Sequence, residues 1–382
     1  MFDVSVIKCD SYNSDEVKSA LSAAIEAVGG LSWVKEGTRI AIKANLVSFM
    51  SPDKAATTHP ALLCELVKML VEKGAEVVVG DSPGGLYNVA FVGRVYKATR
   101  MHDVESVGAK LNHNFGQSEA KNDNGVVLKS FTYTSWLDEA DAIINFCKLK
   151  THGMMGMSAA AKNIFGVVPG TLKPEYHFKF PNHSDFARML VDLDEYFKVK
   201  LCICDAVIGM EGNGPTMGTP RKIGAILASE SPHKMDLVCA KIIGLTKNDV
   251  PTLEAAFERG LIPESVEMLN VFGDVDSFVI PDYKNIPAHA SIEFKKDSSK
   301  FFGKMARFIT SSALRSTPWL KTMECVGCGV CRDICPAKAI KIEKEKAVID
   351  RNNCIRCFCC QEFCPKGAMK VKRTLIAKIL NK

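Results

Sequence analysis

Over its first 290 residues the chain alternates short apolar stretches with longer amphipathic ones. The apolar stretches have the length and composition of buried strands. They span residues 4–9, 39–47, 76–81, 142–146, 201–207 and 222–229. The amphipathic stretches predict helices that begin at Ser14, His59-Pro60 and Ser231-Pro232 and end near Gly29-Gly30, Gly74 and Leu245. Apolar strands separated by helices indicate an α/β fold, with a mostly parallel sheet and helices on both faces.

Positive charge gathers where the strand over 142–146 is expected to end. Lys148, Lys150 and His152 follow this strand, and a Met- and Ala-rich stretch with Lys162 and Asn163 comes next. We expect residues 153–165 to form a helix, whose N-terminus carries free N–H groups and partial positive charge. The segment therefore predicts a site for a phosphate, a carboxylate or an enolate. The alternative is a set of solvated surface lysines.

Other predicted strands also end in polar residues. Lys43 and Asn45 close the strand over 39–47, and Asp81 closes the strand over 76–81. The strand over 201–207 leads into GMEGNGPTMG (209–218), which carries Glu211 and Asn213. Open α/β sheets bind ligands at the carboxyl ends of their strands, and glycines permit close backbone approach to a ligand. These positions predict a cleft, although the glycine-rich loop is also compatible with a tight surface turn.

Other residues of this region have structural interpretations. The neighbouring methionines 154, 155 and 157 are expected in the core, as are the thiols of Cys202 and Cys204. His177 and His183 are candidates for a lid over the cleft, or else ordinary structural histidines.

Composition places the protein among ordinary globular chains. It has 382 residues, of which 47% are hydrophobic and 24% charged, and the length suggests two or three domains. No stretch of 18 or more apolar residues is present, and the first residues lack the pattern of a secretory signal. We expect a cytoplasmic protein.

The fifteen cysteines are unevenly distributed, and nine of them lie between Cys325 and Cys364. Eight form two runs of the pattern C-x2-C-x2-C-x3-C-P. This spacing is typical of two [4Fe-4S] clusters, in which the fourth cysteine of each run crosses to the other cluster. Structural zinc more often uses two pairs of ligands. Cys359 falls outside the pattern and is interpreted as a small buried filler. The predicted ligands are Cys325, Cys328, Cys331 and Cys364 for the first cluster, and Cys354, Cys357, Cys360 and Cys335 for the second.

The predicted division of the chain has four parts. An α/β domain for a ligand or substrate covers 1–294, a basic amphipathic linker 295–321, a two-cluster domain 322–372 and a basic tail 373–382. The basic segments contribute to the net charge of +6. We expect them to pack across the two domains; contact with a membrane surface and docking of an acidic electron donor are the alternatives. No reader motif for nucleic acid is present.

Two resemblances add to these predictions. The segment 322–372 resembles a bacterial-type two-cluster ferredoxin module, which implies a small α+β domain of two pseudo-symmetric halves with IKIEKEKAVID as a hairpin between them. The blocks IKANL, GAEVVVGDSPGG, KLKTHGMMGMSAAAKNIFGVVPG and DAVIGMEGNGPTMG resemble the family called domain of unknown function 362 over about residues 1–290. Members often carry such a module. Cys147 stands where the family commonly has proline. The resemblance implies that the motif positions are site residues, without naming a reaction.

Together these predictions lead to the hypothesis of an iron–sulfur oxidoreductase, with roles for the individual site residues. Lys148, Lys150, His152 and Lys162 would act on an anionic substrate, with His152 or Lys150 as the proton donor. Lys43, Asn45, Asp81, Asn163, Glu211 and Asn213 would bind a cofactor or substrate. The partner would be a protein that donates or accepts electrons at low potential. The sequence neither requires nor excludes a flavin or another small cofactor. The alternatives are a non-catalytic electron-transfer or cofactor-assembly protein and a redox sensor.

Overall fold

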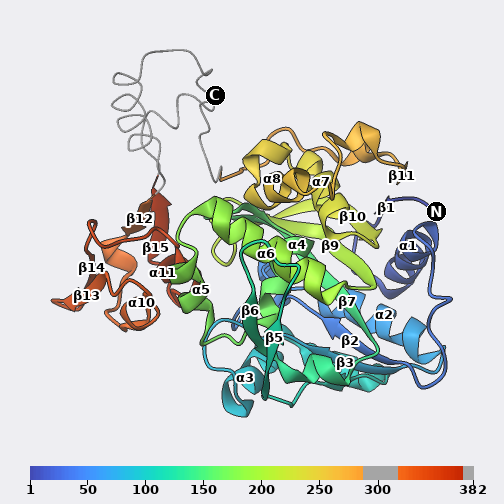
Figure 1. Cartoon of the computed structure of the whole chain (residues 1–382), viewed down its shortest axis with the longest axis horizontal. Helices are drawn as coiled ribbons and strands as arrows, with labels where there is room; N and C mark the ends of the chain where they lie inside the picture. The colour runs from blue at the N-terminus through green and yellow to red at the C-terminus, as the bar shows by residue number, and fades with distance from the viewer. Residues whose placement is uncertain (287–316, 373–382) are drawn as a thin grey trace.

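A mixed, mostly parallel sheet forms the centre of the molecule, and a small second unit lies on one side of it (Figure 1). The structure is a computed structural model that describes residues 1–286 and 317–372. The central strands run in the order β11-β1-β10-β9-β7-β2-β3-β4, with β8 paired to β7. They are β1 Val4–Lys8, β2 Arg39–Lys43, β3 Glu76–Gly80, β4 Lys110–Leu111, β7 Ala142–His152, β8 Gly156–Ser158, β9 Leu201–Glu211, β10 Thr219–Ser229 and β11 Val271–Phe272.

Helices cover both faces of this sheet, as the apolar pattern predicted. Alternate residues of one strand point to opposite faces, so Ile144 and Phe146 belong to one core cluster while Cys147 and Leu149 belong to the other. One face packs on α1 Ser14–Ala27, α2 Pro60–Val71 and α3 Val89–Thr99. The other packs on α4 Ala160–Asn163, α6 His183–Phe197, α7 Pro232–Ile242 and α8 Pro251–Glu258. A separate hairpin, β5 Gln117–Lys121 with β6 Ser130–Thr134, extends this second core.

The prediction of one helix over residues 153–165 was wrong. β7 does not stop at Phe146 but continues to His152, turns back through β8, and only then enters the four-residue helix α4. Gly156 has φ 71°, a left-handed conformation that glycine adopts without strain, at the start of β8. The basic residues therefore lie on a strand, and no long helix presents its N-terminus to an anion. The strand predicted over 39–47 is also shorter, ending at Lys43.

The second unit is small and built from two similar halves. Its elements are β12 Thr317–Leu320, α10 Val330–Asp333, β13 Ile340–Glu343, β14 Lys346–Ile349, α11 Cys359–Glu362 and β15 Met369–Lys372. The predicted hairpin is confirmed as β13 paired with β14. β12, inside the stretch assigned to the linker, pairs with β15. Residues 295–316 of the predicted linker and the tail 373–382 lie outside the described residues.

Candidate functional site

A pocket lies where β2, β3 and β7 end. It is lined mainly by polar side chains from segments far apart in the sequence. Predicted site residues that line it are Lys43, Asn45, Asp81, Lys150, His152, Lys162 and Asn163; the other lining residues are Val47, Ser82, Pro83, Gly84, Ser158, Phe165, Gly166, Lys173, Pro215 and Glu362. Lys148, Glu211 and Asn213 are not among the lining residues.

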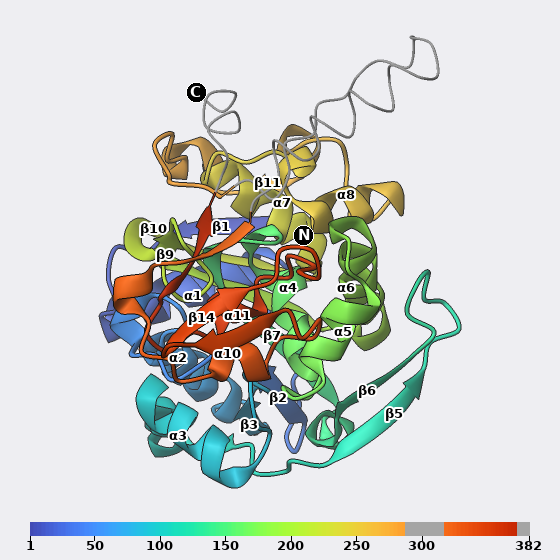
Figure 2. The same cartoon turned by 90° about the vertical axis from the view of Figure 1, so that its left-hand side faces the viewer.

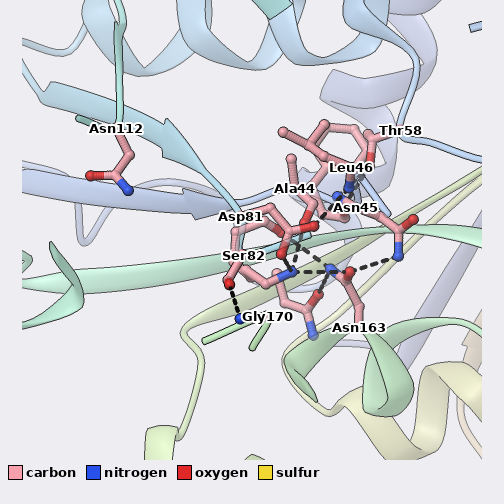
Figure 3. Close-up of polar contacts among 12 residues, drawn as sticks. Ala44, Asn45, Leu46, Thr58, Asp81, Ser82, Asn112, Asn163 and Gly170 are labelled. Atoms are coloured by element: carbon pink, nitrogen blue, oxygen red, sulfur yellow. Dashed lines mark hydrogen bonds and ion pairs between the residues drawn. The ribbon is translucent and has the colours of Figure 1, made fainter. Parts of the chain in front are cut away.

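The floor of the pocket is a continuous network of hydrogen bonds. Lys43 Nζ forms an ion pair with Asp81 Oδ1 at 2.7 Å and donates to Asn163 Oδ1 at 3.2 Å. Asn45 Nδ2 donates to the same oxygen of Asn163 at 2.9 Å. Figure 3 shows Asp81, Asn163 and Asn45 close together, whereas Asn112 lies apart from them. Because each of these groups holds its neighbour, the network fixes the positions of the side chains around the ligand space.

The close approach of these groups depends on a glycine. A Cβ atom placed on Gly166 would lie 2.2 Å from Asp81 Oδ1 and 2.4 Å from Lys43 Nζ. Ser82, next to Asp81, accepts a hydrogen bond at its Oγ from the backbone N–H of Gly170 at 2.8 Å (Figure 3). The loop 166–170 is thus closely packed on the end of β3.

Lys150 forms no ion pair with a carboxylate among the described residues, although Glu362 lies near enough to oppose the lowering of its pKa. Its Nζ donates to Asn45 Oδ1 at 2.8 Å and to the carbonyl of Ala56 at 2.6 Å, and both acceptors are neutral. Burial lowers the pKa of Lys150 to about 7. The ammonium has three N–H groups, and two are used by these acceptors. One donor of Lys150 is available to a bound anion.

Two further lysines complete a positively charged wall. Lys173 donates from Nζ to the carbonyl of Ser82, and burial lowers its pKa to about 7. Lys162 lies over the ring of Phe165, with 4.7 Å between Nζ and the ring centroid, and burial lowers its pKa as well. Within the described residues Lys162 has neither a hydrogen bond nor an ion pair. Four lysines thus surround one pocket that contains only two carboxylates, Asp81 and Glu362.

His152 is neutral in this setting. Its Nδ1 accepts from the backbone N–H groups of Met154 and Met155, at 3.1 and 3.3 Å. These contacts assign the ring proton to Nε2, which is buried and has no hydrogen-bond partner in the described parts of the chain. Burial holds the pKa of His152 well below its usual value. The ring therefore offers one neutral N–H donor.

Lys148, which we predicted as a site residue, instead forms a buried structural ion pair. Its Nζ lies 2.8 Å from Asp205 Oδ2 and 2.9 Å from the hydroxyl of Tyr12. The pairing of β7 with β9 shifts register between Lys148 and Lys150, so that Lys148 lies opposite Asp205 and Lys150 opposite Met210. The two lysines consequently direct their ammonium groups to different surroundings.

The glycine-rich loop, residues 209–218, contacts Gln361 of the small unit. Glu211 is buried and bound by Lys284, through its backbone N–H at 3.2 Å and its Nζ at 3.3 Å. The carbonyls of Asn213 and Gly214 each accept from Gln361 Nε2 at 3.2 Å. The structure therefore places this loop against the small unit, and the side chains of Glu211 and Asn213 outside the pocket lining.

Helix α11 of the small unit contributes one residue to the pocket lining. Glu362 lines it, and the carbonyl of Glu362 accepts from Thr216 Oγ1 at 3.2 Å. Phe363 packs so tightly on Gly84 that a Cβ at this glycine would lie 1.6 Å from the ring. Figure 1 shows α11 on the side of the small unit that faces the α/β domain, with the β13–β14 hairpin pointing away from it. The view of Figure 2 has the small unit in front of the central sheet.

The sequence did not point to several of these residues. Lys173 lies in a short helix, α5 (Lys173–Lys179), with no strand end before it to mark it as part of the site. Glu362 lies far along the chain between two predicted cluster ligands. Asp236 on α7 accepts from the backbone N–H groups of Ala160 and Ala161, at 2.7 and 3.0 Å, and so holds the first turn of α4. His177 and His183 do not line the pocket, and His177 stacks on Phe186.

The remaining structural predictions for this region are confirmed. Met154, Met155 and Met157 are buried in the core, as are Cys202 and Cys204, and Cys359 is buried as well. Their packing role explains why a Met-rich stretch adjoins a polar pocket.

The predicted cluster ligands are arranged as two groups in the small unit. Cys325, Cys328, Cys331 and Cys364 line one cavity, as the crossing of the fourth cysteine requires. Among the described residues no three His, Cys, Asp or Glu side chains converge on a point suitable for a single metal ion.

The thiols of the second predicted group also lie near one another. Burial raises the pKa of the Cys354 thiol, and the nearby thiols of Cys357 and Cys335 contribute to the shift. The fourth cysteines are also equivalent: Cys335 Sγ accepts from the N–H of Ala339, and Cys364 Sγ from the N–H of Ala368, both at 3.2 Å. Hydrogen bonds to sulfur are among the features that set cluster potentials. These residues would hold the two clusters.

Comparison with known proteins identifies both parts of the chain. A family model described as a domain of unknown function (DUF362) matches residues 40–241, more than half of the 382 residues. The chain belongs to the DUF362 family. In this DUF362 protein a 4Fe-4S dicluster domain also matches residues 317–365. Both predicted resemblances are thereby confirmed, and the dicluster domain supports electron transfer by iron–sulfur clusters.

The DUF362 chain is also similar to a thylakoid-associated protein of Synechocystis sp., at 28% identity over 285 residues, covering 74% of this chain and 87% of the relative. Solved structures are more distant. The lactate racemase apoprotein of Thermoanaerobacterium thermosaccharolyticum has 11% identity and a TM-score of 0.38, with 62% of this chain and 56% of that chain covered. A protein from Thermotoga maritima has 16% identity and a TM-score of 0.35, with 56% and 55% covered. The chain spans little more than half of either structure.

No helix among the residues that the structure describes is long and apolar enough to cross a membrane. The cytoplasmic location expected from the sequence stays a prediction.

Proposed function

We propose that this protein is an iron–sulfur oxidoreductase that reduces, or in reverse oxidises, an anionic substrate bound in the lysine-rich pocket. The observation that carries the proposal is the position of α11. This helix contains Cys360, a predicted ligand of the second cluster, and two residues later Glu362 lines the pocket. The electron-transfer module and the charged pocket therefore share one structural element.

The charge of the pocket favours an anion as the ligand. Four lysines line the pocket but only two carboxylates do. Removing an ammonium group from water without a charged partner costs several kcal/mol. Burial accordingly lowers the pKa of Lys150 and of Lys173. A bound anion would supply the missing partner. Two uncompensated lysines fit a ligand with two negative charges, such as a dicarboxylate or a phosphate ester.

Lys150 is the better candidate for the proton donor. A general acid works best when its pKa lies near the operating pH, and the pKa of Lys150 is about 7. His152 is less suitable because burial keeps it neutral, so its Nε2–H serves to hold the substrate. Bound clusters would supply single electrons from an external donor, while Lys150 supplies a proton and recovers it from solvent.

Hydrogen bonds hold Lys150 and its neighbours in fixed positions. Lys150 is held by Asn45 and Ala56, and Asn45 is held by Asn163. The side chains of Lys43, Lys150 and Lys173 are buried, which strengthens their interaction with an anion. A flavin or another small cofactor in the same pocket stays a prediction that the experiment below addresses.

The test begins with full-length protein purified without oxygen. Iron and sulfide are counted, and any small molecule released on denaturation is identified. The protein is then reduced with dithionite, freed of the reductant, and mixed with anionic acceptors while the visible absorbance of the clusters is followed. We expect one class of dianion to reoxidise the wild type rapidly. Lys150→Met and Lys162→Met should lose this reaction.

Lys179→Met is the matched control, because Lys179 is an exposed lysine outside the pocket lining. It should behave like the wild type. Equal reoxidation rates in all three variants would refute the pocket as the substrate site. If no acceptor reacts and the protein copurifies with a larger redox enzyme, the non-catalytic electron-transfer role is favoured instead.

A further inference from the structure

Helix α4 contains two pocket residues but begins after a residue that cannot cap it. Lys162 and Asn163, the last two residues of this four-residue helix, line the pocket. The residue before the helix is Ala159, whose side chain has no oxygen to accept from the first free N–H groups. A single helical turn is also too short to be stable through its own hydrogen bonds. The position of α4 must therefore be set by other parts of the chain.

An aspartate on another helix takes the place of the missing cap. Asp236 of α7 is 1% exposed. Its Oδ1 and Oδ2 accept from the backbone N–H groups of Ala160 and Ala161, at 2.7 and 3.0 Å. Because two consecutive N–H groups are bound by the two oxygens of one carboxyl group, the contact fixes the direction of the first turn as well as its place. Asp236 itself is not among the residues that line the pocket.

Lys162 depends on this cap more than Asn163 does. The side chain of Asn163 makes four hydrogen bonds, with residues of β2, of β7 and of the loop that follows β2. Lys162 has neither a hydrogen bond nor an ion pair within the described parts of the chain, and its Nζ lies 4.7 Å from the centre of the Phe165 ring. The direction of the Lys162 ammonium group is therefore set mainly by the backbone of α4.

We propose that Asp236 is a positioning residue of the pocket, which directs the ammonium group of Lys162 towards the bound anion by holding the first turn of α4. The inference rests on the proposed function, because it concerns the same pocket. Asp236 would touch neither the ligand nor the reacting atoms. Its contribution to anion binding passes through Lys162, whereas Lys150 is placed by β7 and does not depend on it.

A second buried aspartate binds backbone N–H groups in the same way, away from the pocket. Asp192 of α6 is 0% exposed and accepts from the N–H groups of residues 126–128, each at 2.8 Å, and from Arg259. Neither Asp192 nor the segment 126–128 lines the pocket. Asp192→Asn is therefore the matched control: it makes the same chemical change at the same burial, and it should lower stability without moving Lys162.

The experiment measures phosphate affinity by calorimetric titration of the full-length, cluster-loaded protein. Asp236→Asn keeps one acceptor oxygen and places an NH₂ group against the other N–H. It should weaken phosphate binding roughly tenfold, as expected when one charge-assisted contact is lost. In a Lys162→Met background the same change should add less than about twofold, whereas in a Lys150→Met background it should add its full effect. Asp192→Asn should bind phosphate like the wild type.

The dependence on Lys162 separates positioning from a general loss of stability. The inference is overturned if Asp236→Asn binds phosphate like the wild type, or if its effect and that of Lys162→Met are additive. It is also overturned if Asp192→Asn loses as much affinity as Asp236→Asn, because the loss would then follow stability and not the position of α4.

A labelling experiment without a ligand keeps this inference distinct from the proposed function. If the wild type binds no phosphate, the proposed anion pocket is refuted, and the position of Lys162 is measured by its acetylation with acetic anhydride. Mass spectrometry compares the rate at Lys162 with the rate at Lys173, which lies on α5. In Asp236→Asn this ratio should rise severalfold, because α4 no longer holds Lys162 in place. An unchanged ratio overturns the inference.

Discussion

Two lysines on one strand, Lys148 and Lys150, show how a buried charge serves structure in one place and ligand binding in another. Both are buried and lie two residues apart on β7. Lys148 meets the carboxylate of Asp205, which also accepts from the backbone N–H of His59 at 3.0 Å. Lys150 meets only neutral oxygens. The type of residue is the same, and the partner decides its role.

The comparison teaches that charge compensation separates the two roles. In a buried pair such as Lys148–Asp205 each charge already has its partner within the folded chain, so an anionic ligand would gain no ion pair there. An uncompensated lysine is destabilised by burial, and a ligand anion relieves this cost. The stability of the first site and the affinity of the second should therefore respond to different substitutions.

The largest effect is expected from breaking the compensated pair. Asp205→Asn leaves the Lys148 charge buried without its carboxylate, and we expect a loss of about 3–5 kcal/mol in the free energy of unfolding. Urea unfolding of the full-length protein under anaerobic conditions measures it. Lys148→Met combined with Asp205→Leu removes both charges and should recover most of the loss. A single substitution that costs no more than an exposed one would contradict the structural role of the pair.

Removing the uncompensated lysine should lower the affinity for the anion and change the free energy of unfolding little. Lys150→Met loses a charge-assisted contact with the anion, which corresponds to about 1.5–3 kcal/mol, or roughly tenfold to a hundredfold in affinity. Calorimetric titration with inorganic phosphate and with oxalate as probes measures this loss. Stability should change much less than in Asp205→Asn, since removal of the buried charge offsets the two lost hydrogen bonds. Unchanged affinity would show that Lys150 does not contact the anion.

The pH dependence sharpens the contrast. Burial lowers the pKa of Lys150 to about 7, so the ammonium is present below this pH and lost above it. The affinity for phosphate or oxalate should therefore fall as pH rises through 7 and beyond, by up to about tenfold per pH unit for one proton. Titration between pH 6 and 9, corrected for ionisation of the probe, tests it. In Lys150→Met this part of the dependence should disappear.

How far the sequence predicts this site depends on the kind of information each residue carries. Lys43, Asn45 and Asp81 were predictable because they close parallel strands, whose ends meet at one edge of the sheet. Lys150 and His152 line the pocket, but they lie on β7 and not before the long helix that the sequence predicted. The two-layer covering of the sheet followed from the apolar pattern alone.

The rest of the site depends on tertiary contacts that spacing does not encode. Nothing in the sequence pairs Lys148 with Asp205, because the pairing follows from the register of β7 with β9. Glu211 and Asn213 lie in a loop whose glycines suggested a ligand, yet those glycines allow close packing against Thr151 and Gln361. Glu362 joins the pocket only because the small unit docks there. Periodicity and motifs describe elements, whereas docking depends on surfaces.

The smallest effect on the compensated pair is expected from Tyr12→Phe, which removes the hydroxyl that bonds both members of the pair and leaves both charges in place. The Tyr12 hydroxyl donates to Asp205 Oδ1 at 3.0 Å and accepts from Lys148 Nζ at 2.9 Å. Each net hydrogen bond of this kind contributes about 1 kcal/mol, so the free energy of unfolding should fall by about 1–2 kcal/mol. Phosphate affinity should not change, because Tyr12 does not line the pocket. A loss of affinity in this variant would mean that the two lysines are energetically coupled along β7, and that charge compensation at one site influences the other.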